Sequence, residues 1–213
     1  MKYKHIIWDW NGTLFDDVHL CLEIINNVLR KRNMETLSLQ KYKTIFTIPV
    51  ENYYKKAGFN FEDESFEIVG KEWMDEYEKR KYEAALTKGA LETVKKIYDY
   101  GISQSILSAY KQNTLEEIVA KFGLTKFMSN VVGLNHIYAT GKLELGKSLI
   151  KKLNNGTNEI LFIGDTLHDF EVAKELGAGS VLLSSGHQNK QTLLSCNVPV
   201  LDDFSELNLF LFG

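Results

Sequence analysis

Two short apolar runs, each ending on an acidic residue, constrain the fold of this chain more than any other feature. The first is Ile6-Ile7-Trp8 followed by Asp9 and a Gly-Thr turn, and the second runs from Ile160 to Ile163 and is followed by Gly164-Asp165. Continuous apolar runs of this length are typical of strands buried on both faces of a parallel sheet. Two acidic strand ends, about 150 residues apart in the chain, suggest a magnesium-assisted phosphoryl site.

Further apolar runs alternate with amphipathic stretches along most of the chain. Three more strands are expected, at 102–107, 131–132 and 181–183. Helices are expected at 90–98, 113–122, 145–153, 169–176 and 204–212. Three of the helical stretches end on glycine, as helices often do: Gly101, Gly123 and Gly177. This alternation predicts an α/β fold with a doubly wound, Rossmann-like parallel sheet.

Residues 16–82 contain no convincing strand and are predicted to form an inserted helical domain, so that the core comprises 1–15 and 83–213. One helix is indicated by apolar residues three and four apart, with Asp16 or Asp17 placed to cap its start: Val18, Leu22, Ile25 and Leu29. Another is indicated by Phe66, Val69, Trp73 and Tyr77, and Pro49 suits the first turn of a third. Trp73 and Tyr77 are interpreted as core of this insertion rather than as substrate contacts.

The composition excludes several classes of protein. A chain of 213 residues, 44% of them hydrophobic, can fill a real core. The net charge of −3 arises from 25 basic and 28 acidic residues mixed along the chain, which is not the footprint of a nucleic-acid partner. From only two cysteines, Cys21 and Cys196, neither a disulfide framework nor a thiolate metal site can be inferred. Without a signal region or a membrane-length apolar run, we expect a cytoplasmic protein, monomeric or homodimeric.

Four motifs, in order along the chain, resemble those of the haloacid dehalogenase superfamily, most closely its phosphoglycolate phosphatase-like phosphatases. They are Asp9-Trp10-Asn11-Gly12-Thr13, the strand Ser105-Ile106-Leu107-Ser108, a lysine at Lys142, and Gly164-Asp165 with Asp169. The resemblance implies a phosphatase that acts on a small phosphorylated metabolite. It also implies that residues 16–82 form an α-helical cap over the active site.

The resemblance implies a role for each motif residue. Asp9 would be the nucleophile that forms an aspartyl-phosphate. Mg2+ would be held by Asp9, the main-chain carbonyl of Asn11, and Asp165, with Asp169 assisting directly or through other groups. Substrate phosphate would be bound by Trp10, Thr13, Ser108, Ala109 and Lys142. The lysine has an alternative in Lys147, because Thr140-Gly141-Lys142-Leu143-Glu144-Leu145-Gly146-Lys147 contains both.

Asn11 is the main departure from the family pattern, in which aspartate usually stands two residues after the nucleophile. A carboxyl group there protonates the leaving oxygen and later takes a proton from water, whereas an amide does neither. General acid-base catalysis is typically worth about 10²–10⁴-fold in rate. Leaving groups that depart without a proton should therefore suffer least. His19, Asp16 and Asp17 are nearby candidates for the missing proton transfer.

Other activities remain open from the sequence. A phosphomutase relies on the missing aspartate, so Asn11 argues against it, and a dehalogenase would not need a magnesium site. A phosphonoacetaldehyde hydrolase needs a lysine from the cap, for which the candidates are Lys31, Lys41, Lys43, Lys55 and Lys56. A phosphate-binding or regulatory protein with little turnover is the alternative from a different class, and Asn11 favours it.

Overall fold

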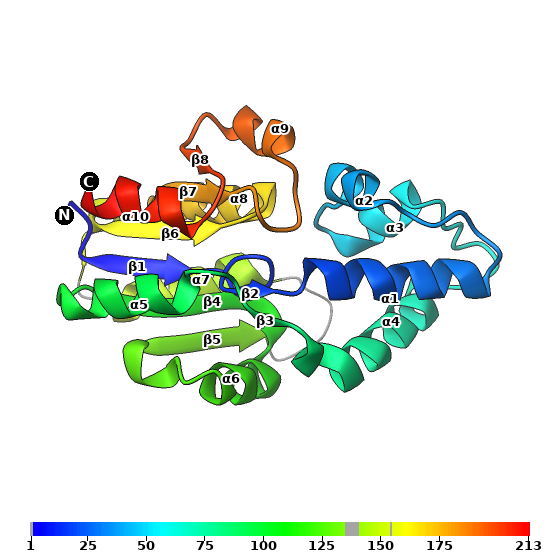
Figure 1. The fold of residues 1–213 in the computed structure, drawn as a ribbon, viewed down its shortest axis with the longest axis horizontal. Coiled ribbons are helices and arrows are strands. Elements are labelled where there is room, and N and C mark those ends of the chain that lie inside the picture. The colour runs from blue at the N-terminus through cyan, green and yellow to red at the C-terminus, as the bar shows by residue number, and fades with distance from the viewer. Residues whose placement is uncertain (1, 135–140, 154) are drawn as a thin grey trace.

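A six-stranded parallel sheet forms the centre of the computed structural model, which describes residues 2–134, 141–153 and 155–213 (Figure 1). The strands are β1 (His5–Trp8), β4 (Ser103–Lys111), β5 (Asn130–Leu134), β6 (Ile160–Gly164), β7 (Gly179–Leu183) and β8 (Val200–Leu201). Their order is β5-β4-β1-β6-β7-β8, and every neighbouring pair is parallel. The α/β fold class and the doubly wound parallel sheet predicted from the sequence are confirmed; β8 was not expected.

Alternate residues of the strands face two different layers of helices. Ile6 and Trp8 belong to an apolar cluster with α5 (Ala90–Asp99), α6 (Gln112–Lys121) and α10 (Phe204–Phe212). Ile7 packs instead with α7 (Lys142–Lys152) and α8 (Leu167–Glu175). Both faces of the central strands are therefore buried, which explains their continuous apolar sequence.

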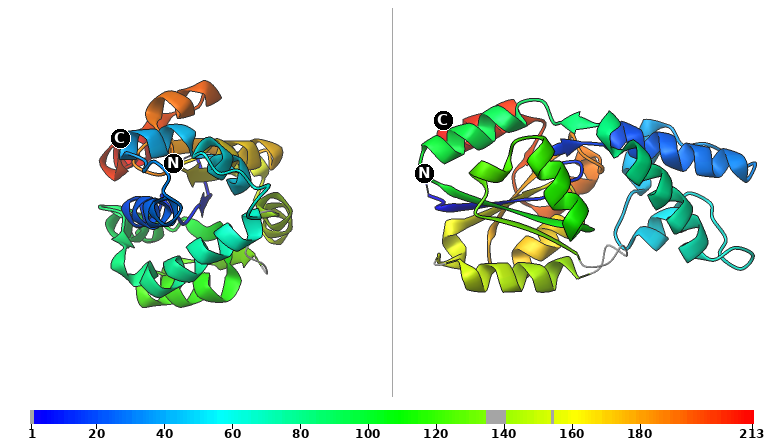
Figure 2. Two further views of the ribbon diagram at one scale, coloured as in Figure 1. Left: turned by 90° about the vertical axis from the view of Figure 1, so that its right-hand side faces the viewer. Right: turned by 90° about the horizontal axis from the view of Figure 1, so that it is seen from below.

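Between Asp17 and Arg80 the regular elements are all helical. They are α1 (Val18–Lys31), α2 (Leu39–Ile45), α3 (Val50–Lys56) and α4 (Phe66–Arg80). This helical unit lies beyond the carboxyl ends of the strands, as Figure 1 and the right-hand view of Figure 2 show. Two short strands, β2 (Phe15–Asp16) and β3 (Ala85–Leu86), pair antiparallel where the chain leaves and re-enters the core. The domain boundaries at 15/16 and 82/83 stay a prediction.

Several local expectations can be compared with the elements. Helix α10 has the predicted bounds, and Gly101, Gly123 and Gly177 follow α5, α6 and α8 with positive φ. Helix α7 begins at Lys142 rather than near residue 145. A short helix, α9 (Lys190–Leu193), was not predicted. None of the helices in the described parts of the chain has the length and apolar character needed to cross a membrane.

Candidate active site

The carboxyl ends of β1, β4 and β6 bring the predicted motif residues together. Asp9 follows β1, Ser108 lies in β4 and Asp165 follows β6, and β1 is the neighbour of both other strands. A cavity of about 90 Å³ opens at this edge. Its lining comprises Asp9, Asn11, Phe46, Ile48, Ser108, Ala109, Lys142, Asp165, Thr166, Asp169 and His187. Of the predicted site residues, only Trp10 and Thr13 are not part of this lining.

The turn after β1 explains where Trp10 and Thr13 lie. Trp10 is fully buried and stacks on Phe15, so its side chain belongs to the core. The Thr13 hydroxyl donates a hydrogen bond of 2.8 Å to Asp165 Oδ1 and thereby orients that carboxylate. Gly12 has φ +76°, and a Cβ there would overlap both Asp165 and His187. The turn thus requires glycine for its conformation and for its close approach to β6.

Lys142, and not Lys147, reaches the carboxylates. The Lys142 Nζ donates to Asp9 Oδ1 and, at 2.6 Å, to Asp169 Oδ1, and its side chain is only 2% exposed. Lys147 pairs with Glu144 at 2.7 Å on the surface of α7, where almost half of its side chain is exposed. The structure therefore distinguishes the two lysines between which the sequence left a choice.

Asp169 accepts four hydrogen bonds, three of them on the same oxygen. Its Oδ2 accepts from the main-chain N–H groups of Asp165 and Thr166 and from the Thr166 hydroxyl, while its Oδ1 accepts from Lys142. Although burial disfavours its charge, the Lys142 ammonium and these hydrogen bonds hold the pKa of Asp169 below its ordinary value. Asp169 thus fixes both Lys142 and the turn after β6.

The buried carboxylates carry more negative charge than Lys142 neutralises. Oxygens of Asp9, Asp165 and Asp169 all lie within 4.8 Å of one another. Burial raises the pKa of Asp9 well above its ordinary value despite the Lys142 charge, and burial likewise raises the pKa of Asp165 to about 6. An all-oxygen donor set with excess negative charge fits a hard divalent cation such as Mg2+.

The side chain of Asn11, two residues after Asp9, has two polar partners. Its Nδ2 donates to Asp17 Oδ2 at 2.7 Å and to the Tyr77 hydroxyl at 2.8 Å. Tyr77 is buried in α4, as expected for a core residue, but its hydroxyl also donates to Asp17 at 2.7 Å. Asp16 and His19, the other nearby candidates for proton transfer, are exposed and do not line the cavity.

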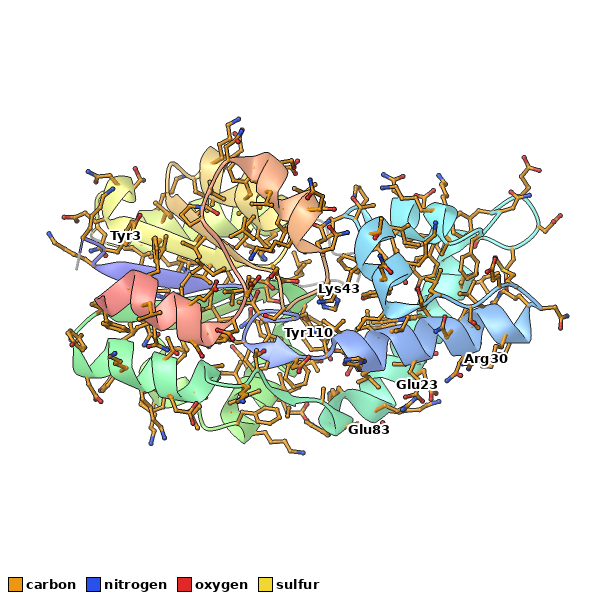
Figure 3. The ribbon with its side chains drawn as sticks, turned by 45° about the horizontal axis from the view of Figure 1, so that its top comes forward. Tyr3, Glu23, Arg30, Lys43, Glu83 and Tyr110 are labelled. Carbon is orange, nitrogen blue, oxygen red and sulfur yellow. The ribbon has the colours of Figure 1, made fainter. Side chains whose placement is uncertain are left out.

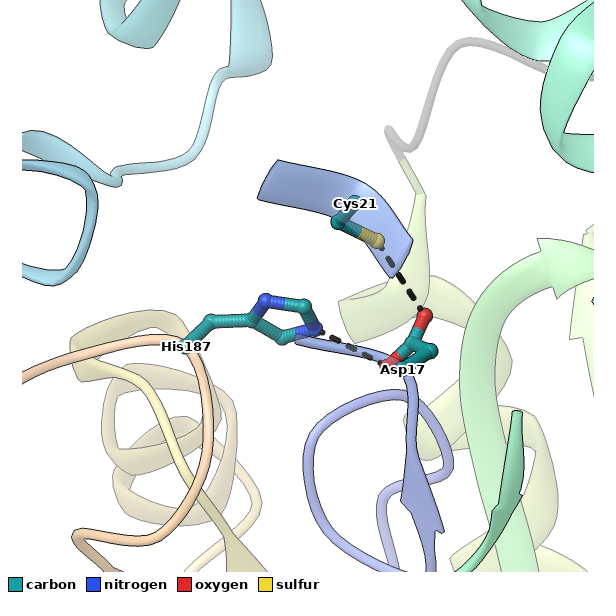
Figure 4. A group of neighbouring side chains, drawn as sticks. All are labelled: Asp17, Cys21 and His187. Carbon is teal, nitrogen blue, oxygen red and sulfur yellow. Dashed lines mark hydrogen bonds and ion pairs between the residues drawn. The ribbon is translucent and has the colours of Figure 1, made fainter. Parts of the chain in front are cut away.

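The expectation that Asp16 or Asp17 caps the start of helix α1 holds for position but not for the hydrogen bond. Asp17 occupies the N-cap position, but its side chain makes no capping hydrogen bond. Instead its carboxylate accepts from Gly12 N at 3.0 Å and forms an ion pair with His187 Nε2 at 3.2 Å, while Cys21 Sγ lies 3.4 Å away (Figure 4). Burial opposes its charge, yet His187 and the hydrogen bonds hold the pKa of Asp17 below its ordinary value.

Sequence reasoning missed His187, which lies in the loop after β7. Its main-chain N–H donates to Asp165 Oδ2 at 2.6 Å, and its Nδ1 lies 2.8 Å from the Tyr42 hydroxyl. Burial alone would lower the pKa of His187, but the Asp17 carboxylate outweighs it and raises the pKa to about 9. Both ring nitrogens have partners outside the cavity. Its position in the chain could have indicated it, because the loop after this parallel strand lies at the same edge of the sheet as Asp9.

The helical unit closes the cavity through the segment around α2. Lys43 Nζ donates to the carbonyl oxygens of Ser184 and Ser185, and Gln188 Nε2 donates to the carbonyl of Phe46 at 2.8 Å. Figure 3 shows Lys43 where this segment meets the core. Phe46 stacks on His187 with ring centroids 4.8 Å apart. Phe46 and Ile48 therefore contribute apolar side chains to the lining of the cavity.

A larger hollow of about 460 Å³ lies elsewhere, between α1 and α4. It is lined mainly by charged surface residues, among which Lys31 and Glu72 form an ion pair of 2.7 Å. None of its lining residues belongs to the carboxylate cluster or to the predicted motifs. The chemistry therefore points to the smaller cavity at the strand ends.

Comparisons with known proteins agree with this geometry. Residues 6–183 match the family model described as haloacid dehalogenase-like hydrolase. A haloacid dehalogenase-like hydrolase from Streptococcus pneumoniae is similar in structure, with a TM-score of 0.83, 15% identity and 99% of each chain covered. A predicted phosphatase from Clostridium acetobutylicum has a TM-score of 0.81, with 17% identity and 98% of each chain covered.

A predicted phosphoglycolate phosphatase from Haemophilus somnus has a TM-score of 0.77, with 19% identity and 99% of each chain covered. No curated protein sequence matches the chain. At these identities the solved structures show the fold, whereas the family model covers most of the sequence itself, including the motifs at Asp9 and Asp165. On that match, the chain belongs to the haloacid dehalogenase-like hydrolases.

Proposed function

We propose that this protein is a magnesium-dependent phosphatase that hydrolyses a small phosphomonoester through an aspartyl-phosphate on Asp9. The observation that carries the proposal is the buried cluster at the end of β1. There Asp9 and Asp169 share the Lys142 ammonium, and Asp165 lies within 4.8 Å. A nucleophile, a fixed positive charge and an oxygen-lined cation site are what phosphoryl transfer requires.

In the first step Asp9 would attack phosphorus with the oxygen that Lys142 does not hold. The Lys142 ammonium lies beside the attacking carboxylate, where it neutralises charge on the transferred group. Ser108 Oγ accepts a hydrogen bond from Tyr110 N at 3.1 Å, which leaves its hydroxyl proton for a phosphate oxygen. Main-chain N–H groups of Ala109 and of the turn after Asp9 would bind the remaining phosphate oxygens.

Mg2+ would be held by Asp9, Asp165 and the main-chain carbonyl of Asn11, and its charge would stabilise the phosphate oxygens. Asp169 would assist by fixing Lys142 and the turn after β6, or by holding the cation with its own Oδ1. Burial raises the pKa of Asp9 and of Asp165 because it disfavours their ionised forms. A bound cation would offset this cost by stabilising the two carboxylates, which supports a cation at this position.

The substrate class follows from the leaving group and from the size of the cavity. Asn11 cannot protonate a leaving oxygen, and both ring nitrogens of His187 have partners outside the cavity. Aryl and acyl phosphates should therefore be better substrates than alkyl phosphates, because their leaving groups depart without a proton. The cavity of about 90 Å³ and its apolar lining at Phe46 and Ile48 favour small substrates. Phosphoglycolate should be among the small-acid phosphates that are assayed, because the structurally similar protein from Haemophilus somnus is named a predicted phosphoglycolate phosphatase.

The test is phosphate release from aryl, acyl, sugar and small-acid phosphates, with magnesium and with chelator. Asp9→Asn removes the nucleophile, and Asp16→Asn, at an exposed neighbouring carboxylate, is the matched control. Magnesium-dependent release by the wild type and by Asp16→Asn, but not by Asp9→Asn, is the expected result. Tight phosphate binding without any phosphorylation of Asp9 would instead favour the alternative that Asn11 suggests, a binding or regulatory protein with little turnover.

A phosphonoacetaldehyde hydrolase is less well supported. That activity needs a lysine from the helical unit at the reacting carbon, and none of Lys31, Lys41, Lys43, Lys55 and Lys56 lines the cavity. Lys43 comes nearest to the core, but its Nζ donates to the two serine carbonyls of the loop after β7.

A further inference from the structure

A polar cluster behind the cavity fixes the side chain of Asn11. Asp17 and Tyr77 each contact its Nδ2, and the Tyr77 hydroxyl donates to the same Asp17 oxygen that accepts from Asn11. Asp17 is 1% exposed and Tyr77 is 2% exposed, and neither lines the cavity, whereas Asn11 does. The Asn11 amide, the Asp17 carboxylate and the Tyr77 hydroxyl therefore form a closed triangle, of which only Asn11 belongs to a residue that lines the cavity.

The chemistry of the partners decides which end of the amide faces them. The Asp17 carboxylate can only accept hydrogen bonds. Its other oxygen accepts from Gly12 N, a group that can only donate, so that oxygen is an acceptor as well. The Tyr77 hydroxyl donates its one proton to Asp17, so toward Asn11 it can only accept a hydrogen bond. Both contacts therefore require the NH2 end of Asn11. Among the described residues, its side-chain hydrogen bonds run only from Nδ2.

We propose that Asp17 and Tyr77 are positioning residues that turn the NH2 of Asn11 away from the cavity and its Oδ1 toward it. There Oδ1 accepts a hydrogen bond from the water that cleaves the aspartyl-phosphate. This inference rests on the proposed function. It gives Asn11 a role in the second step while leaving the first step without a proton donor at this position.

The second step balances without proton transfer to Asn11. The water oxygen forms a bond to phosphorus, and the bond between phosphorus and the Asp9 oxygen breaks with its electron pair remaining on Asp9. Asp9 returns to a carboxylate, and both water protons leave on the phosphate product as dihydrogen phosphate. Asn11 Oδ1 aligns the water through one hydrogen bond and releases it with the product. An orienting hydrogen bond of this kind is worth about threefold to tenfold in rate.

Tyr77→Phe removes one of the two anchors and keeps the ring. Tyr110→Phe is the matched control, because Tyr110 packs edge-on against Tyr77 but its hydroxyl donates to Glu78 at 2.6 Å, away from Asn11. One readout is solvent exchange of the Asn11 side-chain amide protons by NMR, with the signals assigned through Asn11→Ala. The other is the decay rate of phosphorylated enzyme after a single turnover of an aryl phosphate.

Tyr77→Phe is expected to speed exchange of an Asn11 amide proton and to slow the decay about threefold to tenfold. The ratio kcat/KM, which reports formation of the phosphoenzyme, should change little. Tyr110→Phe should change neither readout. Equal behaviour of the two variants in both readouts would overturn the inference. A wild-type protein that never becomes phosphorylated would refute the proposed function instead, and the amide exchange rates would then decide on their own whether Asp17 and Tyr77 hold Asn11 as inferred.

Discussion

Replacing Lys142 by methionine should destabilise the protein by a large and calculable amount. Lys142 is 2% exposed and its ammonium lies between Asp9 and Asp169. Methionine keeps most of the apolar stem, so the main change is the loss of the charge between two buried carboxylates. Deleting one partner of a buried ion pair typically costs about 3–5 kcal/mol. Since domains are stable by only about 5–15 kcal/mol, this loss is readily measured.

The assay is equilibrium unfolding in urea, at pH 5 and at pH 8. Without Lys142, the folded-state pKa of Asp9, already raised by burial, should rise further. A carboxyl group with a raised folded-state pKa binds more protons in the folded state, so stability falls as the pH rises above the unfolded value of about 4. The destabilisation by Lys142→Met should therefore be larger at pH 8 than at pH 5.

Lys147→Met is the control, because that lysine makes only a surface pair with Glu144. Exposed pairs contribute about 0–1 kcal/mol, so the control should unfold almost as the wild type does. Equal losses in the two variants, or a Lys142→Met loss that does not depend on pH, would refute the argument that Lys142 neutralises a buried carboxylate cluster.

Three further predictions concern the turn after β1 and its partners. The double variant Asn11→Asp/Asp17→Asn exchanges the two side chains, so that one donor still faces one acceptor, and it places a carboxyl group at position 11. Turnover of alkyl phosphates should then rise about tenfold or more relative to aryl phosphates, whereas an unchanged ratio of the two rates would contradict the role assigned to Asn11. Gly12→Ala should cost clearly more than the about 1–2 kcal/mol expected for Gly101→Ala, because both have positive φ but only the Gly12 Cβ meets other atoms; urea unfolding compares them. The pKa of His187 is raised to about 9, so its ion pair stabilises the fold fully below about pH 6.5 and is lost as the pH rises through 9. The wild type should thus lose about 3 kcal/mol relative to His187→Gln between pH 6 and pH 10, and parallel curves would exclude this.

The sequence by itself determined the sheet and the residues at its functional edge. Apolar runs buried on both faces indicated parallel strands, and the carboxylates at their ends, Asp9 and Asp165, followed from where those runs stop. This worked because strand burial and strand ends are local properties of the chain, and because the carboxyl ends of neighbouring parallel strands share one edge. Lys142 was preferred to Lys147 for its distance to Asp165 and its place before a helix, but only the structure shows that Lys142 reaches the carboxylates.

Only the tertiary structure decided the surroundings of Asn11. A local rule assigned Asp16 or Asp17 to the cap of α1. Asp17 takes the N-cap position, but the fold places His187, from 170 residues later, and Tyr77, from α4, against its carboxylate, and these partners replace a capping hydrogen bond. Phe46 likewise lines the cavity because α2 packs on the loop after β7. Helix and strand periodicities extend over a few residues, whereas these contacts join distant segments whose meeting depends on how the helical unit packs on the sheet.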